Sequence, residues 1–177
     1  MDFVDVVTSR KSVRDYQDKA VEEEKLEKIL QAARLVPSWA NKQCTRYIVI
    51  KEKKTIEELA STFIGWIKQA PIVIAACANP KDSGTHNNMD YYLVDVGISM
   101  EHLVLGATDQ GLGTCWIGGF DEAKVKKTLQ IPENIKVVAL TPLGYPAALS
   151  RRSKLVRSSS GAEKRKSLEE IVHKEKW

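Results

Sequence analysis

The stretch that decides the fold is PIVIAACA at residues 71–78, an unbroken apolar run bounded by prolines at 71 and 80. An apolar run of this length, with a proline near each end, predicts a strand that is buried on both faces. The segment KVVALTPL at 136–143 predicts a second buried strand, ended by Gly144 and Pro146. Shorter strands are expected at 46–50 and 114–117, which gives about four strands in all.

Helical patterns stand between these strands. Residues 21–35 place Leu26, Ile29 and Ala33 on one helical face, and Pro37 ends the pattern. Other helices are expected at about 3–7, 55–63 and 122–129, with a polar loop at 79–88.

The segment at 89–110 predicts the longest helix. It is apolar nearly all round, so its own domain or another subunit must cover every side of it. Strands interspersed with helices in this way define an α+β or α/β class.

Composition restricts the class of protein. A chain of 177 residues favours one domain, and its net charge of +4 suits an anionic ligand without demanding nucleic acid. The three cysteines have neither disulfide-framework nor zinc-site spacing, and the histidines have no metal-ligand spacing, so no metal is expected. Neither a signal peptide nor a membrane span is visible, and we expect a cytoplasmic protein with no membrane partner.

A basic cluster follows the first predicted helix. Arg10, Lys11, Ser12 and Arg14 supply two guanidiniums, an ammonium and a hydroxyl within five positions. Guanidiniums grip phosphate through a planar fork, so the cluster has phosphate-binding chemistry. The alternative is a solvated helix end, which is the commoner meaning of a short basic run.

Two further clusters suit a flat heterocycle. Pro37, Ser38, Trp39 and Asn41 follow a predicted helix, where the alternative is an ordinary polar loop. The glycine-rich stretch at 111–119 lacks the spacing of a dinucleotide fingerprint.

Gly118 and Gly119 in that stretch would let backbone N–H groups approach a ligand, or would form a strand-end turn. Trp39 and Trp116 adjoin these clusters and could stack on a ring.

The basic tail at 151–166 has no apolar pattern of its own. We expect an extended, solvated arm there, which could instead reach a ligand phosphate or a nucleic acid. A short helix or strand is expected at 168–172.

Taken in order, RKSVR (10–14), PSWANKQ (37–43), GLGTCWIGGF (111–120), PLGYP (142–146) and KRKSLEEIVH (164–173) resemble the nitroreductase family of flavin-dependent oxidoreductases. The resemblance covers nearly the whole chain. It implies an α+β three-layer fold with a central, mainly antiparallel sheet flanked by helices, and a long buried helix at the core or dimer interface. It also implies a single FMN-binding domain at 1–177 that forms a homodimer, with an arm at about 147–177 that wraps the partner subunit.

The resemblance also implies roles for individual residues. Arg10 and Ser12 would hold the FMN phosphate, with Lys11 between them, and Arg14 would support the N1/O2 edge of the ring electrostatically. The partner subunit would supply a loop. The residues of that loop are Pro37, Ser38, Trp39 and Asn41.

The rest of the implied site comes from the later motifs. Trp116, Ile117, Gly118 and Gly119 would cover one ring face and offer an N–H near N5. Arg165 would return to the phosphate, with Lys164 beside it.

The sequence departs from the family pattern in three places. Cys44 and Thr45 stand where Pro-Trp is frequent, and Gly118 replaces an acidic residue seen in some branches. Glu163 occupies the place of a phosphate-binding lysine, for which Lys164 or Lys166 would substitute.

The expected function is hydride transfer from NADH or NADPH, through FMN, to an electron-poor small molecule such as a nitroaromatic or quinone, by a ping-pong mechanism. Because flavin carries this chemistry, the chain needs no catalytic triad of its own. One alternative is a flavin protein of the same fold with a specialised reaction, such as reductive dehalogenation, or a ligand-sensing role. A nucleic-acid module built on 151–166 is a third hypothesis, although no recognised nucleic-acid motif supports it.

Overall fold

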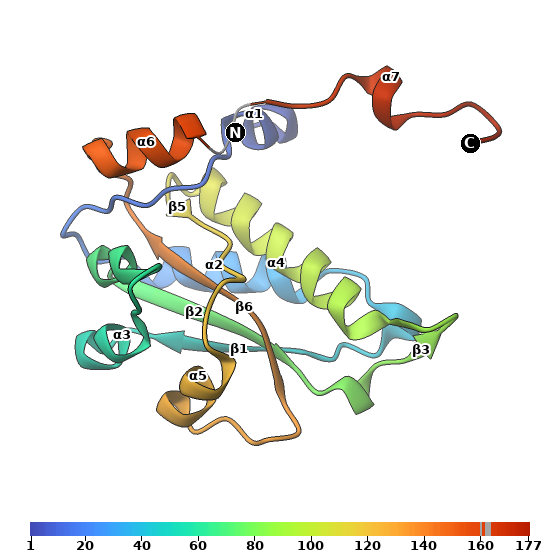
Figure 1. Cartoon of the computed structure of the whole chain (residues 1–177), viewed down its shortest axis with the longest axis horizontal. Helices are drawn as coiled ribbons and strands as arrows, with labels where there is room; N and C mark the ends of the chain where they lie inside the picture. Colours follow the sequence, from blue (N-terminus) through green and yellow to red (C-terminus); the bar gives the residue numbers. More distant parts are fainter. Residues whose placement is uncertain (160, 162–163) are drawn as a thin grey trace.

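The computed structural model describes residues 1–159, 161 and 164–177, and its centre is a four-stranded antiparallel sheet (Figure 1). The strands are β1 (Thr45–Ile50), β2 (Ile72–Ala78), β6 (Lys136–Gly144) and β5 (Gly113–Thr114), in the spatial order β1-β2-β6-β5. This arrangement confirms the expected class, α+β, and the strands predicted at 46–50, 71–78 and 136–143. The strand predicted at 114–117 is shorter and earlier, and Ile117 forms only an isolated bridge with Leu140.

Strand β2 divides the core in two. Ile72, Ile74 and Ala76 face one hydrophobic cluster, while Val73 and Ala75 face the other. This alternation follows from the period of two along a strand, and it explains why the run at 71–78 is apolar throughout.

Helices cover both faces of the sheet, which gives three layers. Helices α2 (Glu23–Arg34) and α4 (Tyr91–Asp109) pack on the first face, where Ile29, Met100 and Leu103 are fully buried. Helices α3 (Lys53–Leu59) and α5 (Glu122–Leu129) cover the second face. Each of these four helices therefore buries apolar residues against the sheet.

Two expectations about the first half were inaccurate. The helix predicted at 55–63 is α3, which ends at Leu59, and a separate 3-10 turn, η2 (Gly65–Gln69), follows beyond the predicted segment. The predicted polar loop contains a 3-10 turn, η3 (Pro80–Asp82), and the first strand of a small hairpin, β3 (Thr85–His86) with β4 (Met89–Asp90). Asn87 and Asn88 adopt φ values of 50° and 59°, the left-handed pair that a tight hairpin turn requires, so α4 begins at Tyr91 rather than at 89.

The ends of the chain also form helices. Helix α1 (Phe3–Ser9) packs on α4, where the Met1 amino group meets Asp109 at 2.9 Å. The tail predicted as an extended arm is helical at its start, α6 (Arg151–Ser159). Beyond it, a capping box at Ser167 begins the short α7 (Leu168–Ile171).

One face of α4 stays uncovered in this chain, because Leu93 and Val94 are exposed. Residues 164–177 are exposed throughout and extend away from the three layers (Figure 1). Among the helices described, none is long and apolar enough to cross a membrane.

Replacing Leu103 by alanine tests this packing. Leu103 is 0% exposed, so we expect Leu103→Ala to lower the free energy of unfolding by about 2–5 kcal/mol, through lost burial and the cavity it leaves. Leu35→Ala is the matched control, because Leu35 is 71% exposed. Urea unfolding at equal protein concentration measures both, and equal losses in the two variants would contradict the description of the core.

Candidate functional site

The basic cluster is fixed against the short strand β5. Val13 N–H donates to the Thr114 carbonyl at 2.8 Å, and Ser12 forms a parallel bridge with Thr114. A Cβ at Gly113 would lie 2.6 Å from Val13 Cγ2, so only glycine allows this approach. The Tyr16 hydroxyl donates to the Val13 carbonyl at 2.7 Å. The cluster is therefore an ordered edge of the sheet rather than a solvated helix end.

Three side chains of this cluster influence the pKa of Cys115. Burial raises the pKa of the Cys115 thiol, while the charge of Arg14, a hydrogen bond with Ser12 and the charge of Arg10 act in the opposite direction. The Arg14 guanidinium also lies over the Trp66 ring, 5.9 Å from its centroid. Lys11 is exposed. A role of Arg10, Ser12 and Arg14 in holding a ligand stays a prediction.

The glycine turn after Cys115 adjoins this group. Trp116 is exposed, and Ile117 exchanges both backbone hydrogen bonds with Leu140, at 2.9 and 3.0 Å. The Ile117 N–H is therefore already used and leaves no donor for a ligand. Nothing lies within 4 Å of where a Cβ would stand on Gly118 or Gly119. Neither glycine amide has a hydrogen-bond partner within the described part of the chain.

Asp15, next to Arg14, connects the cluster to α6. Its carboxylate accepts the Ser150 N–H at 3.2 Å, and Ser150 Oγ accepts the Ser153 N–H at 3.2 Å. These caps explain why the tail begins with a helix. Burial alone would raise the pKa of Asp15, but hydrogen bonds from Ser153 and Ser150 outweigh it and hold the pKa below its usual value.

The loop predicted to meet a heterocycle has an unusual backbone. It runs from Pro37 to Gln43 and contains the 3-10 turn η1 (Trp39–Asn41). The backbone φ values of Ala40, Asn41 and Gln43 are 46°, 53° and 50°. Residues other than glycine rarely adopt such values. The Ser38 hydroxyl accepts the Gln43 N–H at 2.9 Å, while Pro37 and Asn41 are exposed.

Trp39 packs within its own chain. Its ring stacks on Tyr91 with centroids 5.5 Å apart, and a Cβ at Gly84 would lie 2.0 Å from the indole. A contact of Trp39 with a cofactor stays a prediction.

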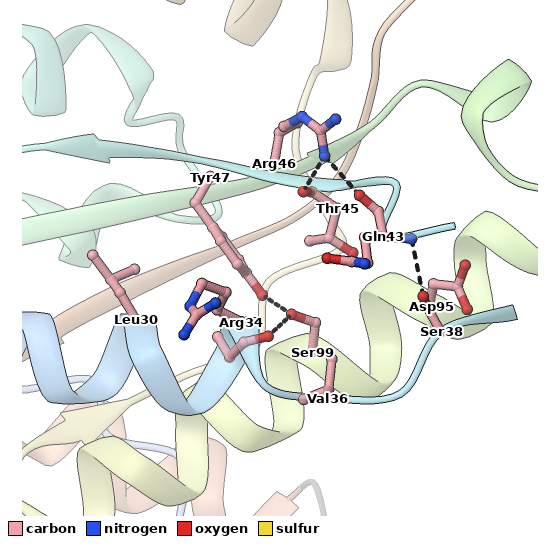
Figure 2. Close-up of a pocket in the computed structure, with 11 residues that line it drawn as sticks. Leu30, Arg34, Val36, Ser38, Gln43, Thr45, Arg46, Tyr47, Asp95 and Ser99 are labelled. Atoms are coloured by element: carbon pink, nitrogen blue, oxygen red, sulfur yellow. Dashed lines mark hydrogen bonds between the residues drawn. The ribbon is translucent and has the colours of Figure 1, made fainter. Parts of the chain in front are cut away.

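Behind this loop lies a cavity of about 280 Å³ (Figure 2). Its lining comes from α2, the loop, β1 and α4, and includes Leu30, Arg34, Ser38, Thr45, Tyr47, Asp95 and Ser99.

Two hydroxyls meet on the wall of this cavity. Tyr47 reaches from β1 to Ser99 on α4, with their hydroxyls 2.7 Å apart. Burial raises the pKa of Tyr47 to about 12, although the hydrogen bond with Ser99 acts to lower it. Sequence reasoning missed Asp95 and Ser99. The available signal was two polar residues four positions apart in an otherwise apolar helix.

One chain does not bring the two halves of the predicted site together. The loop is bound to Asp95 near the start of α4, whereas α1, which leads into the basic cluster, packs at the other end of α4 (Figure 1). With a rise of about 1.5 Å per residue, the stretch from Asp95 to Asp109 separates the loop contact from the Met1 contact by roughly 20 Å. Arg10 lies nearer the middle of α4, where burial raises the pKa of Glu101 and the charge of Arg10 acts to lower it.

The remaining predicted residues are exposed. Lys164 N–H donates to Gly161 at 2.8 Å, and Arg165 Nη1 donates to the Lys164 carbonyl at 2.8 Å. These contacts do not involve the basic cluster, so a phosphate role for either residue, or for Lys166, stays a prediction. Glu163 lies outside the described residues. In the described part of the chain, no three His, Cys, Asp or Glu side chains are grouped to hold a metal ion.

The three-layer α+β fold thus carries a cationic cluster and open backbone amides at one sheet edge, groups whose chemistry suits an anion. The chain belongs to the nitroreductase family, because residues 2–177 match the family model described as "Putative TM nitroreductase". The crystal structure of a nitroreductase family protein from Clostridium novyi NT is 42% identical, with a TM-score of 0.78, over 83% of this chain and 86% of that chain.

Two other relatives carry more specific names. A protein of Archaeoglobus fulgidus named "Putative NADH dehydrogenase/NAD(P)H nitroreductase" is 34% identical over 80% of this chain and 83% of its own length. The structure of an FMN-dependent nitroreductase from Clostridium difficile R20291 is 25% identical, with a TM-score of 0.76, over 99% of this chain and 100% of that chain. These matches confirm the family and the fold that the sequence motifs indicated.

The lowered pKa of Asp15 predicts a pH-dependent contribution to stability. A carboxyl whose pKa is depressed by folding stabilises the protein above its unfolded pKa of about 3.9, and this contribution is lost as pH falls through the folded value. We therefore expect Asp15→Asn to be less stable than the wild type at pH 7 and the difference to shrink towards pH 3. Urea unfolding at both pH values measures it, and a difference that does not change with pH would contradict the assignment.

Proposed function

We propose that the protein is an FMN-dependent oxidoreductase that takes hydride from NADH or NADPH and passes it to an electron-poor acceptor, such as a nitroaromatic or a quinone. The carrying observation is geometric. The Val13–Thr114 hydrogen bond and the Ser12–Thr114 bridge fix the segment that bears Arg10, Ser12 and Arg14 beside β5, and β5 leads directly to the open glycine amides at 118 and 119. The family membership and the FMN and NAD(P)H in the names of the two relatives support the same cofactor pair.

The residues present fit an FMN molecule. Arg10 and Ser12 offer a guanidinium and a hydroxyl to its phosphate, a charge-assisted pairing. Arg14, held over Trp66, would place positive charge at the N1/O2 edge, where it stabilises negative charge on the reduced ring. Gly118 and Gly119 would present amide N–H groups to the ring, and their lack of side chains leaves room for it.

Bound FMN supplies the hydride acceptance and donation. The protein therefore needs only to bind and orient the cofactor and its substrates and to exclude water. We propose a ping-pong order, in which the oxidised nicotinamide leaves before the acceptor enters the same position. The exposed Trp116 next to the glycine turn is available to stack on that position.

We further propose that the working unit is a homodimer whose sites combine both chains. The loop at 37–43 lies far from the basic cluster of its own chain, so it would act on the cofactor of a second copy. Apolar side chains left uncovered on α1 and α4, among them Phe3, Val4, Leu93 and Val94, suit a self-complementary two-fold interface. The exposed apolar residues of 164–177, including Leu168 and Ile171, would wrap the second copy.

The absorbance spectrum of the purified protein tests the cofactor directly. We expect a yellow protein that releases FMN on denaturation, and anaerobic bleaching of the flavin bands on mixing with NADH or NADPH. A colourless protein that does not bind added FMN would overturn the proposal. If the flavin is bound but neither NADH nor NADPH bleaches it, the proposed reductase activity is wrong and only a flavin-binding role remains.

Two arginine variants separate the proposed contacts. Loss of a charge-assisted bond costs about 1.5–3 kcal/mol, so Arg10→Ala and Arg14→Ala should each raise the Kd for FMN by roughly 10- to 150-fold. Riboflavin, which lacks the phosphate, distinguishes them: its Kd should rise in Arg14→Ala and stay unchanged in Arg10→Ala.

Lys28→Ala serves as the control, because Lys28 pairs with Glu24 on the exposed side of α2. Equal effects of both arginine variants on riboflavin binding would contradict the division of roles.

A further inference from the structure

Asp95 on α4 is a buried carboxylate that accepts hydrogen bonds from two loops. It is 2% exposed. Its Oδ1 accepts the Trp39 N–H at 2.8 Å, and its Oδ2 accepts the Ser83 hydroxyl at 3.2 Å and the Cys44 thiol at 3.4 Å. Burial of a carboxylate is costly unless donors satisfy it, and here the loops supply every recorded donor.

The loop held in this way has a strained backbone. Three of the four residues at 40–43 have a left-handed backbone conformation although none is glycine. They are Ala40, Asn41 and Gln43. Such conformations persist only where the surroundings over-determine them. The Asp95 bonds fix the residue before this stretch (Trp39) and the residue after it (Cys44), so the carboxylate bridges both ends of the strained segment.

Ser99, a second polar residue of α4, has a different role. Ser99 lies one turn further along and donates to the Ala33 carbonyl at 2.7 Å. It also meets the Tyr47 hydroxyl, as Figure 2 shows. Ser99 therefore holds α2 and β1, the framework on either side of the loop, and does not contact the strained segment itself. A comparison of variants at Asp95 and Ser99 can therefore distinguish an effect of the loop's geometry from an effect of general packing.

We infer that Asp95 is a positioning residue, which holds Ser38 and Asn41 in the geometry needed to meet the flavin bound by a second copy of the chain. This inference rests on the proposed function. Asp95 itself faces the inside of the fold and would not touch the cofactor. It acts through the backbone N–H of Trp39 and the thiol of Cys44, and the stacking of Trp39 on Tyr91 reinforces the same geometry.

The test compares Asp95→Ala with Ser99→Ala, because each removes buried hydrogen bonds from the same face of α4. Both should lower the melting temperature. Only Asp95→Ala should raise the Kd for FMN, by about tenfold for the loss of a net hydrogen-bonded contact, and shift the visible absorption band of the bound flavin. Asp95→Asn keeps a carbonyl oxygen for the Trp39 N–H, so it should restore FMN binding to within about threefold of wild type.

The outcomes discriminate between three situations. If Asp95→Ala and Ser99→Ala change FMN binding and the flavin band equally, or if neither changes them, Asp95 is structural only and the inference is wrong. If Asp95→Ala does not fold, Ser83→Ala replaces it, with an expected rise of about threefold in the Kd because one donor of three is lost. A wild-type protein that binds no FMN would overturn both this inference and the proposed function.

Discussion

The burial of α4 (Tyr91–Asp109) between the sheet and α2 is the constraint on which the rest of the structure depends. Met100 and Leu103 have no contact with solvent, and they pack against the same face of β2 that Ile74 supplies. Because hydrophobic burial of this kind dominates the free energy of folding, the helix has one position and one rotation. Everything attached to its two ends is thereby held at a fixed separation. Gly111, at φ +72°, ends the helical region and directs the chain into β5.

That separation explains the arrangement of the candidate site. One end of α4 carries Asp95 and with it the strained loop, and the other end carries α1, which leads into Arg10 and the edge of β5. A rigid helix between the two prevents them from meeting within one chain. The same helix leaves Leu93 and Val94 uncovered, which is the surface that a second copy would need. The separation within one chain and the proposed two-chain site therefore have a common physical origin.

Much of the fold could be predicted because apolar runs and helical periodicity act locally. The run at 71–78 identified β2, and the pattern at 122–129 gave the bounds of α5. The failures had non-local or turn-level causes. Helix α6 depends on a cap from Asp15, 135 positions before Ser150, and the hairpin at 85–90 depends on two left-handed asparagines in a stretch that is simply polar.

In the site, the clustered charges were recognised from the sequence. Asp95 was missed, because two polar residues in an apolar helix do not reveal which loops they bind. The sequence predicted an N–H for the ligand somewhere in residues 116–119, and the structure excludes that of Ile117, because Leu140 of β6 accepts it.

Subunit complementation tests most directly the central claim that two chains build each site. Arg10→Ala and the double variant Ser38→Ala/Asn41→Ala would be dissociated, mixed in equal amounts and reassociated, and NADH-driven reduction of a nitroaromatic would be measured. In a mixed two-fold dimer one site carries both changes and the other carries none, so the mixture should recover about a quarter of the wild-type activity. Activity no higher than the mean of the two separate variants would contradict the account.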